Sequence, residues 1–183
     1  MFRHLVLILA SVFIARGDES CDRKEMEDTI CSLCAQRKGN NLVGTGNKQI
    51  AFFAYMSKNM RTNTFSKHKI FVYDRTEINI GNGYDVKSGK FTAPVSGVYI
   101  FHTSTVAYDR SHCIVEVVQN GVVKDIGWAD AMHHSDRASA STMTILQLKK
   151  GDIVNSRVGA YHGGNYLESN AVNRMSFSGF RLA

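Results

Sequence analysis

Residues 49–183 consist almost entirely of short runs with strand character that end in turn-forming residues. The Asn-Gly dipeptides at 82–83 and 120–121 suit tight hairpins because they tolerate positive φ. A Lys-Gly-Asp sequence at 150–152 is typical of a further turn. Turn signals recur at intervals of roughly 8 to 12 residues, and no convincing long helix interrupts them. The pattern therefore predicts an all-β fold, a sandwich of short strands.

The only proline of the chain, Pro94, lies inside the stretch GKFTAPVSGVYIF at 89–101. Proline has no backbone N–H and cannot donate to a sheet ladder, so it is not expected in the middle of a strand. Pro94 therefore predicts a break between two strands.

Residues 1–17 have the layout of a secretory signal peptide: a basic start, an apolar centre over 5–14 and small residues before position 18. The apolar run is shorter than the roughly 20 residues of a membrane helix, so we expect a secreted, extracellular protein without membrane insertion. Two of the 22 Lys and Arg and none of the 16 acids lie in this segment, which leaves a formal charge of +4. This mild basicity permits an anionic partner without requiring one, and we expect no nucleic-acid partner.

Three cysteines, Cys21, Cys31 and Cys34, crowd into residues 18–46, while Cys113 stands alone in an apolar run. Outside the cell such a cluster favours disulfides, whose partners the sequence leaves open, and the odd number suggests that one cysteine pairs with another chain. The single Cys-x-x-Cys has no second pair at zinc-finger spacing, so we predict no metal there. Cys113 is interpreted as a small buried hydrophobe.

The same segment contains Met26, Ile30 and Leu33 at helical spacing among charged residues. This pattern predicts a short helix that would need copies of itself or the domain for stability, and a frayed linker is the alternative. We therefore divide the chain into a signal peptide (1–17), a cysteine-containing oligomerisation or linker segment (18–46) and a β domain (47–183).

Eight residues of the β domain have the spacing of a long family signature: aromatic, Asn, aromatic, Phe and then Gly-x-Tyr-x-Phe. They are Tyr73, Asn79, Tyr84, Phe91, Gly97, Tyr99, Phe101 and Thr103. The sequence therefore resembles the complement C1q globular-head family of the tumour-necrosis-factor-like superfamily, and most of all its secreted molluscan members. Tyr73 departs from the pattern, which has Phe there, and Thr103 stands where the pattern has Phe or Tyr.

The resemblance implies a jelly-roll β-sandwich of about ten strands that assembles as a homotrimer, with a corner between two strands at Pro94. The signature residues are then scaffold and not a binding site. No HExxH, GxSxG, P-loop or dinucleotide-binding motif is present, so we expect a protein that is not an enzyme. No cofactor is indicated. Calcium binding by carboxylates such as Asp109, Asp130, Asp136 and Asp152 stays open, although no EF-hand spacing is present.

Two predicted loops, 128–139 and 160–170, combine aromatic rings with polar side chains, which suits the recognition of pyranose rings and their hydroxyls. The candidate ligand-binding residues are Asp130, His133, His134, Asp136, Arg137, Tyr161, His162, Asn165 and Tyr166. Ordinary solvated loops have a similar composition. A zinc site from the three histidines lacks a supporting spacing, and a basic loop at 58–69 offers an alternative site for a polyanion.

The function that follows is that of a secreted, lectin-like pattern-recognition protein of innate immunity, which binds microbial or self glycans through loops of a trimer. Two alternatives remain open: a cytokine-like receptor ligand, and a structural component of extracellular matrix or shell.

Overall fold

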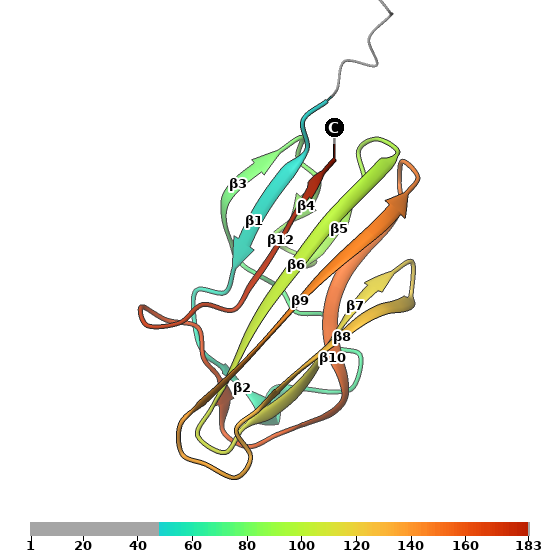
Figure 1. The fold of residues 1–183 in the computed structure, drawn as a ribbon. Helices are drawn as coiled ribbons and strands as arrows, with labels where there is room; N and C mark the ends of the chain where they lie inside the picture. Colours follow the sequence, from blue (N-terminus) through green and yellow to red (C-terminus); the bar gives the residue numbers. More distant parts are fainter. Residues whose placement is uncertain (1–47, 183) are drawn as a thin grey trace, which may run out of the picture. The chain divides into compact units, whose positions relative to one another are not determined.

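Alternation of inward and outward side chains gives each strand one face toward a common core. In β9 (Arg137–Leu148), every second residue from Thr142 onward is buried and the residues between them are exposed. This period of two is what a sheet with one covered face requires. The computed structural model describes residues 48–182, whose strands form a pair of antiparallel sheets that pack face to face (Figure 1).

Sheet A has seven strands in the order β2-β11-β6-β12-β1-β3, with β9 paired to β6. Its strands are β1 (Ala51–Tyr55), β2 (Met60–Arg61), β3 (Arg75–Ile80), β6 (Gly97–Tyr108), β9, β11 (Tyr166–Leu167) and β12 (Ser176–Arg181). Sheet B has five strands in the order β4-β5-β10-β7-β8. Its strands are β4 (Tyr84–Asp85), β5 (Lys90–Thr92), β7 (His112–Gln119), β8 (Val122–Asp130) and β10 (Ile153–Gly163).

This arrangement confirms the predicted all-β jelly-roll sandwich. The predicted signal peptide, the helical segment and the cysteines Cys21, Cys31 and Cys34 lie outside the described residues. Within residues 48–182, the structure contains no helix that is long and apolar enough to cross a membrane.

Two of the predicted chain breaks are confirmed. Pro94 lies between β5 of sheet B and β6 of sheet A, so it marks the corner at which the chain changes sheets. Asn120 and Gly121 join β7 to β8 with φ of 49° and 86°, as a two-residue hairpin with both central residues left-handed requires.

The expected hairpin at Asn82 is wrong. Asn82 does have a positive φ of 53°, but β3 pairs only with β1 in sheet A and β4 pairs only with β5 in sheet B. The side chain of Asn79 explains the path of the chain, because its Nδ2 donates to the carbonyl of Tyr84 at 2.8 Å and its Oδ1 accepts from the Tyr84 N–H at 3.1 Å. The connection is therefore a crossover between sheets that is held by an asparagine side chain.

The core centres on the ring of Phe52. Tyr84 and Phe91 of sheet B stack on it with centroid distances of 5.0 and 5.1 Å, and Phe177 meets it edge-on at 5.0 Å. Phe101 lies against Phe91 and Phe177 at 5.3 and 5.8 Å. All five rings are buried, so the aromatic positions of the signature act as scaffold, as predicted.

Both departures from the signature bring a hydroxyl group that finds a buried partner. The Tyr73 hydroxyl lies 2.9 Å from Oγ of Ser156, and Oγ1 of Thr103 lies 2.9 Å from Oγ1 of Thr142. A buried hydroxyl without a partner is costly, so each departure depends on a second residue, Ser156 of β10 or Thr142 of β9.

An ion pair ties the start of β9 to the segment after β11. The guanidinium of Arg137 donates to both carboxylate oxygens of Glu168, at 2.6 and 3.0 Å, and lies 4.7 Å from the ring centre of Tyr108. Glu168 is buried and also accepts from the side-chain amides of Asn170 and Asn173, at 3.1 and 2.9 Å. Every oxygen of this buried carboxylate therefore has a partner.

Tyr73→Phe is expected to lower the free energy of unfolding by about 1 kcal/mol, because it leaves the buried Ser156 hydroxyl without its partner. Ser156→Ala should do the same from the other side, and the double variant should lose less than the sum of the two. Chemical denaturation of the four proteins measures this coupling. Tyr161→Phe is the matched control, since its ring is exposed. Additive losses at 73 and 156 would contradict the pairing.

Stability is expected to fall in acid because of Glu168. Hydrogen bonds from Arg137 hold the pKa of this carboxyl at about 2 against the opposing effect of burial, and hydrogen bonds from Asn173 and Asn170 lower it further. A lowered folded-state pKa stabilises the fold above the unfolded-state pKa of about 4.3, and this contribution is lost as the pH falls toward 2. Thermal unfolding from pH 6 to 2 measures the effect. The Glu168→Gln variant should be less stable than the wild type at pH 6, and its melting temperature should change less with pH below about pH 4.5. Identical pH profiles of the melting temperature for the two proteins would disprove the assignment.

Candidate functional site

The strands that carry the candidate residues run further than the sequence predicted. β8 continues to Asp130 and β9 begins at Arg137, so the connection between them is only 131–136. β10 likewise continues to Gly163. Asp130 and Tyr161 are therefore held on strands of sheet B and not on the loops expected from the sequence.

A bulge in β10 sets the position of Tyr161. Val158 pairs with Val115 and His162 pairs with Cys113, so three residues of β10 stand opposite the single Ile114 of β7. Such bulges bend a strand and re-aim its side chains. Gly159 permits the close approach, because a Cβ at this position would overlap the side chain of Ile114.

Trp128 reaches the same surface from the neighbouring strand. It pairs with Ile114 across β7 and β8, and its ring lies nearly parallel to that of Tyr161, at 10° and with centroids 6.4 Å apart. The two residues are 53% and 64% exposed, although large aromatic side chains are usually covered. Trp128 lies in the predicted loop 128–139 but is not one of the candidate residues expected from the sequence, and it comes to lie beside Tyr161 because β8 and β10 both pair with β7.

Polar and apolar groups border this pair of rings. Asp130 lies two residues beyond Trp128 on the same face of β8, is exposed and accepts the N–H of Met132 through Oδ1 at 2.9 Å. Ile126, two residues before Trp128, is exposed as well. We call the surface formed by Ile126, Trp128, Asp130 and Tyr161 the aromatic face of sheet B.

Three other candidates lie where the end of β6 meets the starts of β9 and β11, and two of them have protein partners for their polar groups. Arg137 is bound to Glu168, and the Nδ2 of Asn165 donates to Oδ2 of Asp109 at 2.6 Å. The ring of Tyr166 packs against Tyr108 at 5.2 Å. These contacts hold the neighbouring strands and turns together. Arg137, Asn165 and Tyr166 are therefore not part of the aromatic face of sheet B.

The remaining candidates are separate from both groups. His133, His134 and Asp136 are exposed in the connection between β8 and β9, whereas the ring of His162 packs edge-on against Phe65 at 5.9 Å. Among residues 48–182, no group of three or more His, Cys, Asp or Glu side chains is placed to hold a metal ion. A zinc site of the three histidines therefore gains no support.

Cys113, the cysteine within the described range, has a free and buried thiol. Burial raises the pKa of this thiol to about 12, so it stays protonated and unreactive at neutral pH. This agrees with the interpretation of Cys113 as a small buried hydrophobe.

The predicted basic loop contains the short strand β2 and a 3-10 turn at Thr62–Thr64. One of its cations is bound within the loop, because the Nζ of the exposed Lys69 donates to the carbonyl of Thr64 at 2.7 Å. A lysine that is engaged by its own loop is less available to a polyanion, so we regard this loop as the weaker site for a ligand.

Comparison with known proteins identifies the family of the chain. The family model described as C1q domain matches residues 51–182. Complement C1q tumor necrosis factor-related protein 3 of Mus musculus is 35% identical over 138 residues, which cover 73% of this chain and 51% of that protein. Complement C1q and tumor necrosis factor-related protein 9A of Homo sapiens is 36% identical over 111 residues, 60% of this chain and 32% of that protein. The chain thus spans about half the length of the first of these relatives.

Solved structures agree with the fold. The globular domain of zebrafish complement 1qA protein has a TM-score of 0.60 at 20% identity, covering 74% of this chain and 98% of that one. Murine APRIL has a TM-score of 0.55 at 12% identity, covering 74% and 100%. The expected likeness to molluscan members stays a prediction. The match over 51–182 and the 35% identity to a curated relative show that the chain belongs to the C1q domain family.

Proposed function

We propose that this protein is a secreted, non-enzymatic recognition protein that assembles as a homotrimer and binds glycans through the aromatic face of sheet B. The observation that carries the proposal is the pair of exposed, nearly parallel rings of Trp128 and Tyr161. Membership of a family whose relatives are named for complement C1q and tumour necrosis factor supports an extracellular role in recognition or signalling.

The chemistry of the aromatic face suits a sugar. The apolar C–H face of a pyranose packs against the face of an aromatic ring, and the polar N–H or O–H at the edge of the Trp or Tyr ring stays free to form hydrogen bonds. A nearby carboxylate accepts hydrogen bonds from the hydroxyl groups of the sugar. Trp128 and Tyr161 would supply the rings, and Asp130 would supply the carboxylate on the same face. A bulged strand and a glycine fix this surface in advance, so little ordering is needed on binding.

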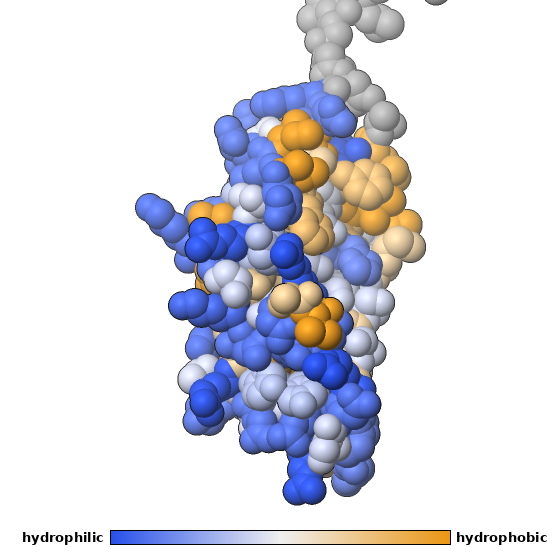
Figure 2. Space-filling model, turned by 90° about the vertical axis from the view of Figure 1, so that its left-hand side faces the viewer, coloured by the Kyte–Doolittle hydropathy of each residue, from blue (hydrophilic) through white to orange (hydrophobic). Residues whose placement is uncertain are grey.

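A second feature, the outward face of sheet A, supports the trimer. Ile80, Ala51, Phe180, Ile100 and Ile145 follow one another as direct partners across β3, β1, β12, β6 and β9. Ile145 is 61% exposed in the single chain, and Ile80 and Phe180 are exposed as well. Figure 2 shows hydrophobic surface concentrated in the upper half of the domain and mostly hydrophilic surface at the lower end.

An apolar row across an outward sheet face usually marks a protein interface. We assign it to further copies of this chain, because the resemblance to the C1q globular-head family implies a homotrimer and the row offers each copy the same apolar surface.

Trp128→Ala and Tyr161→Ala should each weaken binding to neutral oligosaccharides about tenfold, a loss that corresponds to about 1.4 kcal/mol per ring. A glycan array identifies a ligand for the wild-type protein, and titration calorimetry measures the variants. Val172→Ala, which shortens an exposed apolar side chain away from this surface, is the control. Unchanged affinities of both aromatic variants would refute the site and favour the receptor-ligand alternative.

Ile145→Glu is expected to convert the trimer to monomers, because it places a charge in an apolar interface. Sedimentation velocity at micromolar concentration measures this under reducing conditions, so that any link through the cysteines of residues 18–46 does not contribute. Val172→Glu introduces the same charge on an exposed loop and should leave the trimer intact. A monomeric wild-type protein, or a trimeric Ile145→Glu variant, would contradict the assigned interface.

A further inference from the structure

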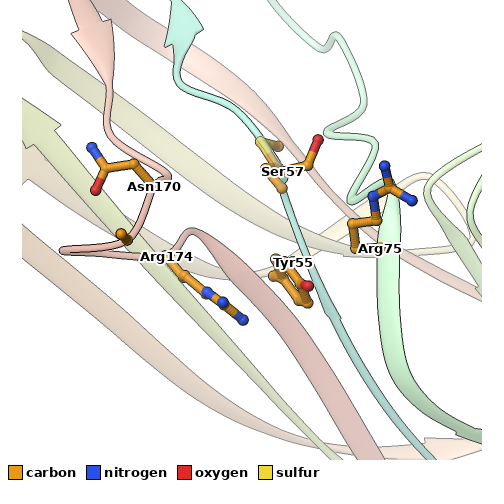
Figure 3. Close-up of a pocket in the computed structure, with 7 residues that line it drawn as sticks. Tyr55, Ser57, Arg75, Asn170 and Arg174 are labelled. Atoms are coloured by element: carbon orange, nitrogen blue, oxygen red, sulfur yellow. The ribbon is translucent and has the colours of Figure 1, made fainter.

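A pocket lies at the far end of β1, away from the aromatic face of sheet B. Its volume is about 460 Å³, and it is lined by Tyr55, Met56, Ser57, Arg75, Asn170, Ala171 and Arg174. Figure 3 shows the ring of Tyr55 between the side chains of Arg174 and Arg75. We call this hollow the arginine pocket.

The registers of three strands create the arrangement. Tyr55 is the direct partner of Arg75 on β3 and of Ser176 on β12, so Arg75 lies on one side of the ring. Arg174, two residues before Ser176, approaches from the other side, with its guanidinium carbon 4.2 Å from the ring centre. The stacking holds this guanidinium in one place, as a cation against an aromatic face.

The lining carries two guanidinium groups and no carboxylate. Two acids stand just outside it, each only in loose contact: Nε of Arg75 lies 3.9 Å from Asp74, and Nη1 of Arg174 lies 3.9 Å from Glu77. Asp74 is also engaged by Ser57, whose N–H and hydroxyl donate to its two oxygens at 2.8 and 2.6 Å. The donor edges of both guanidinium groups are therefore not matched by a close carboxylate.

A planar guanidinium with five donors suits the oxygens of a carboxylate or sulfate, and two such groups in the lining of one pocket both attract an anion. The rest of the lining is not ionic: the ring of Tyr55, Met56 and Ala171 offer apolar surface next to the cations. A ligand that fits both the cations and the apolar surface carries an anionic group on a ring with an apolar face.

We propose that the arginine pocket binds the anionic group of an acidic oligosaccharide, with Arg75 and Arg174 as its recognition residues and with Tyr55 holding Arg174 in place by stacking. The proposal rests on glycan recognition as the proposed function and adds the chemical class of a second subsite. Carboxylate and sulfate are both planar or tetrahedral oxyanions that a guanidinium can bind, so the experiment compares an oligosaccharide with carboxylates alone to one with carboxylates and sulfates.

The pocket is compatible with the proposed trimer. Along the outward face of sheet A, the row of Ile80 and Ile145 is apolar, whereas the row of Tyr55 continues through Ser176 and Ser104 to Ser141. The apolar row and the arginine pocket thus occupy different ends of β1.

The experiment compares three tetrasaccharides on the full-length protein by titration calorimetry: a hyaluronan tetrasaccharide with carboxylates, a chondroitin 6-sulfate tetrasaccharide with added sulfates, and neutral chitotetraose. We expect the wild type to bind at least one acidic tetrasaccharide at least tenfold more tightly than chitotetraose. The double variant R75Q/R174Q should lose this preference and keep its melting temperature, since both side chains are exposed.

The matched control is K87Q/K150Q, which removes the same charge from two exposed lysines outside the pocket. An equal loss in both double variants would show non-specific attraction and overturn the proposal, as would the absence of any preference for acidic over neutral tetrasaccharide. R75K/R174K, which keeps the charge but not the fork of donors, should recover only a fraction of the preference.

The double variant W128A/Y161A separates this inference from the proposed function. If it loses neutral binding and keeps the acidic preference, both sites stand. If it changes nothing while R75Q/R174Q abolishes the acidic preference, the aromatic face fails and the arginine pocket stands.

Discussion

The stack of rings around Phe52 is the constraint on which the other features of the domain depend. Phe52, Phe101 and Phe177 come from sheet A, and Tyr84 and Phe91 come from sheet B, so one cluster joins both layers. Large rings in contact bury more apolar surface than any other side chains, and their removal from a core costs about 3 to 5 kcal/mol. Because these rings fix which face of their own strands points inward, they also fix which side chains of those strands point outward. The outward positions of Ala51 and Tyr55 on β1, Ile100 on β6 and Phe180 on β12 follow from that choice.

Much of this fold could be predicted from the sequence because its signals are local or form a long pattern. Pro94 breaks the chain for a reason that belongs to one residue, its missing N–H, and the left-handed φ of Asn120 and Gly121 likewise depends on only two. Asn82 shows where such reasoning ends. It adopts the left-handed conformation that its type allows, but whether the next strand returns to the same sheet depends on Asn79, whose side chain holds the backbone of the crossover.

The candidate site was less predictable, since it is made by registers and not by neighbours in the sequence. Tyr161 was predicted as a candidate, but its position beside Trp128 depends on a bulge in β10 opposite Ile114 of β7. No dipeptide in the sequence indicates this bulge. Arg75 and Arg174 are about a hundred positions apart and meet at one tyrosine only through the pairing of β1 with β3 and β12. Residue type alone also made Arg137 a candidate for ligand binding, although its guanidinium is bound by Glu168 within the protein.

In the proposed trimer, sheet A forms the interface between subunits and sheet B carries the aromatic face, and this arrangement affects how strongly a ligand binds. An exposed pair of rings with one carboxylate offers a sugar only a few contacts, so a single site of this kind binds weakly. Three identical copies held by the apolar row of sheet A would present three such sites on one rigid body, and a surface with repeated sugars could engage them together. The second and third contacts are then intramolecular and raise the apparent affinity without any new interaction. Selectivity would follow from spacing as much as from sugar identity, because only ligands whose repeats match the distance between subunits gain this advantage.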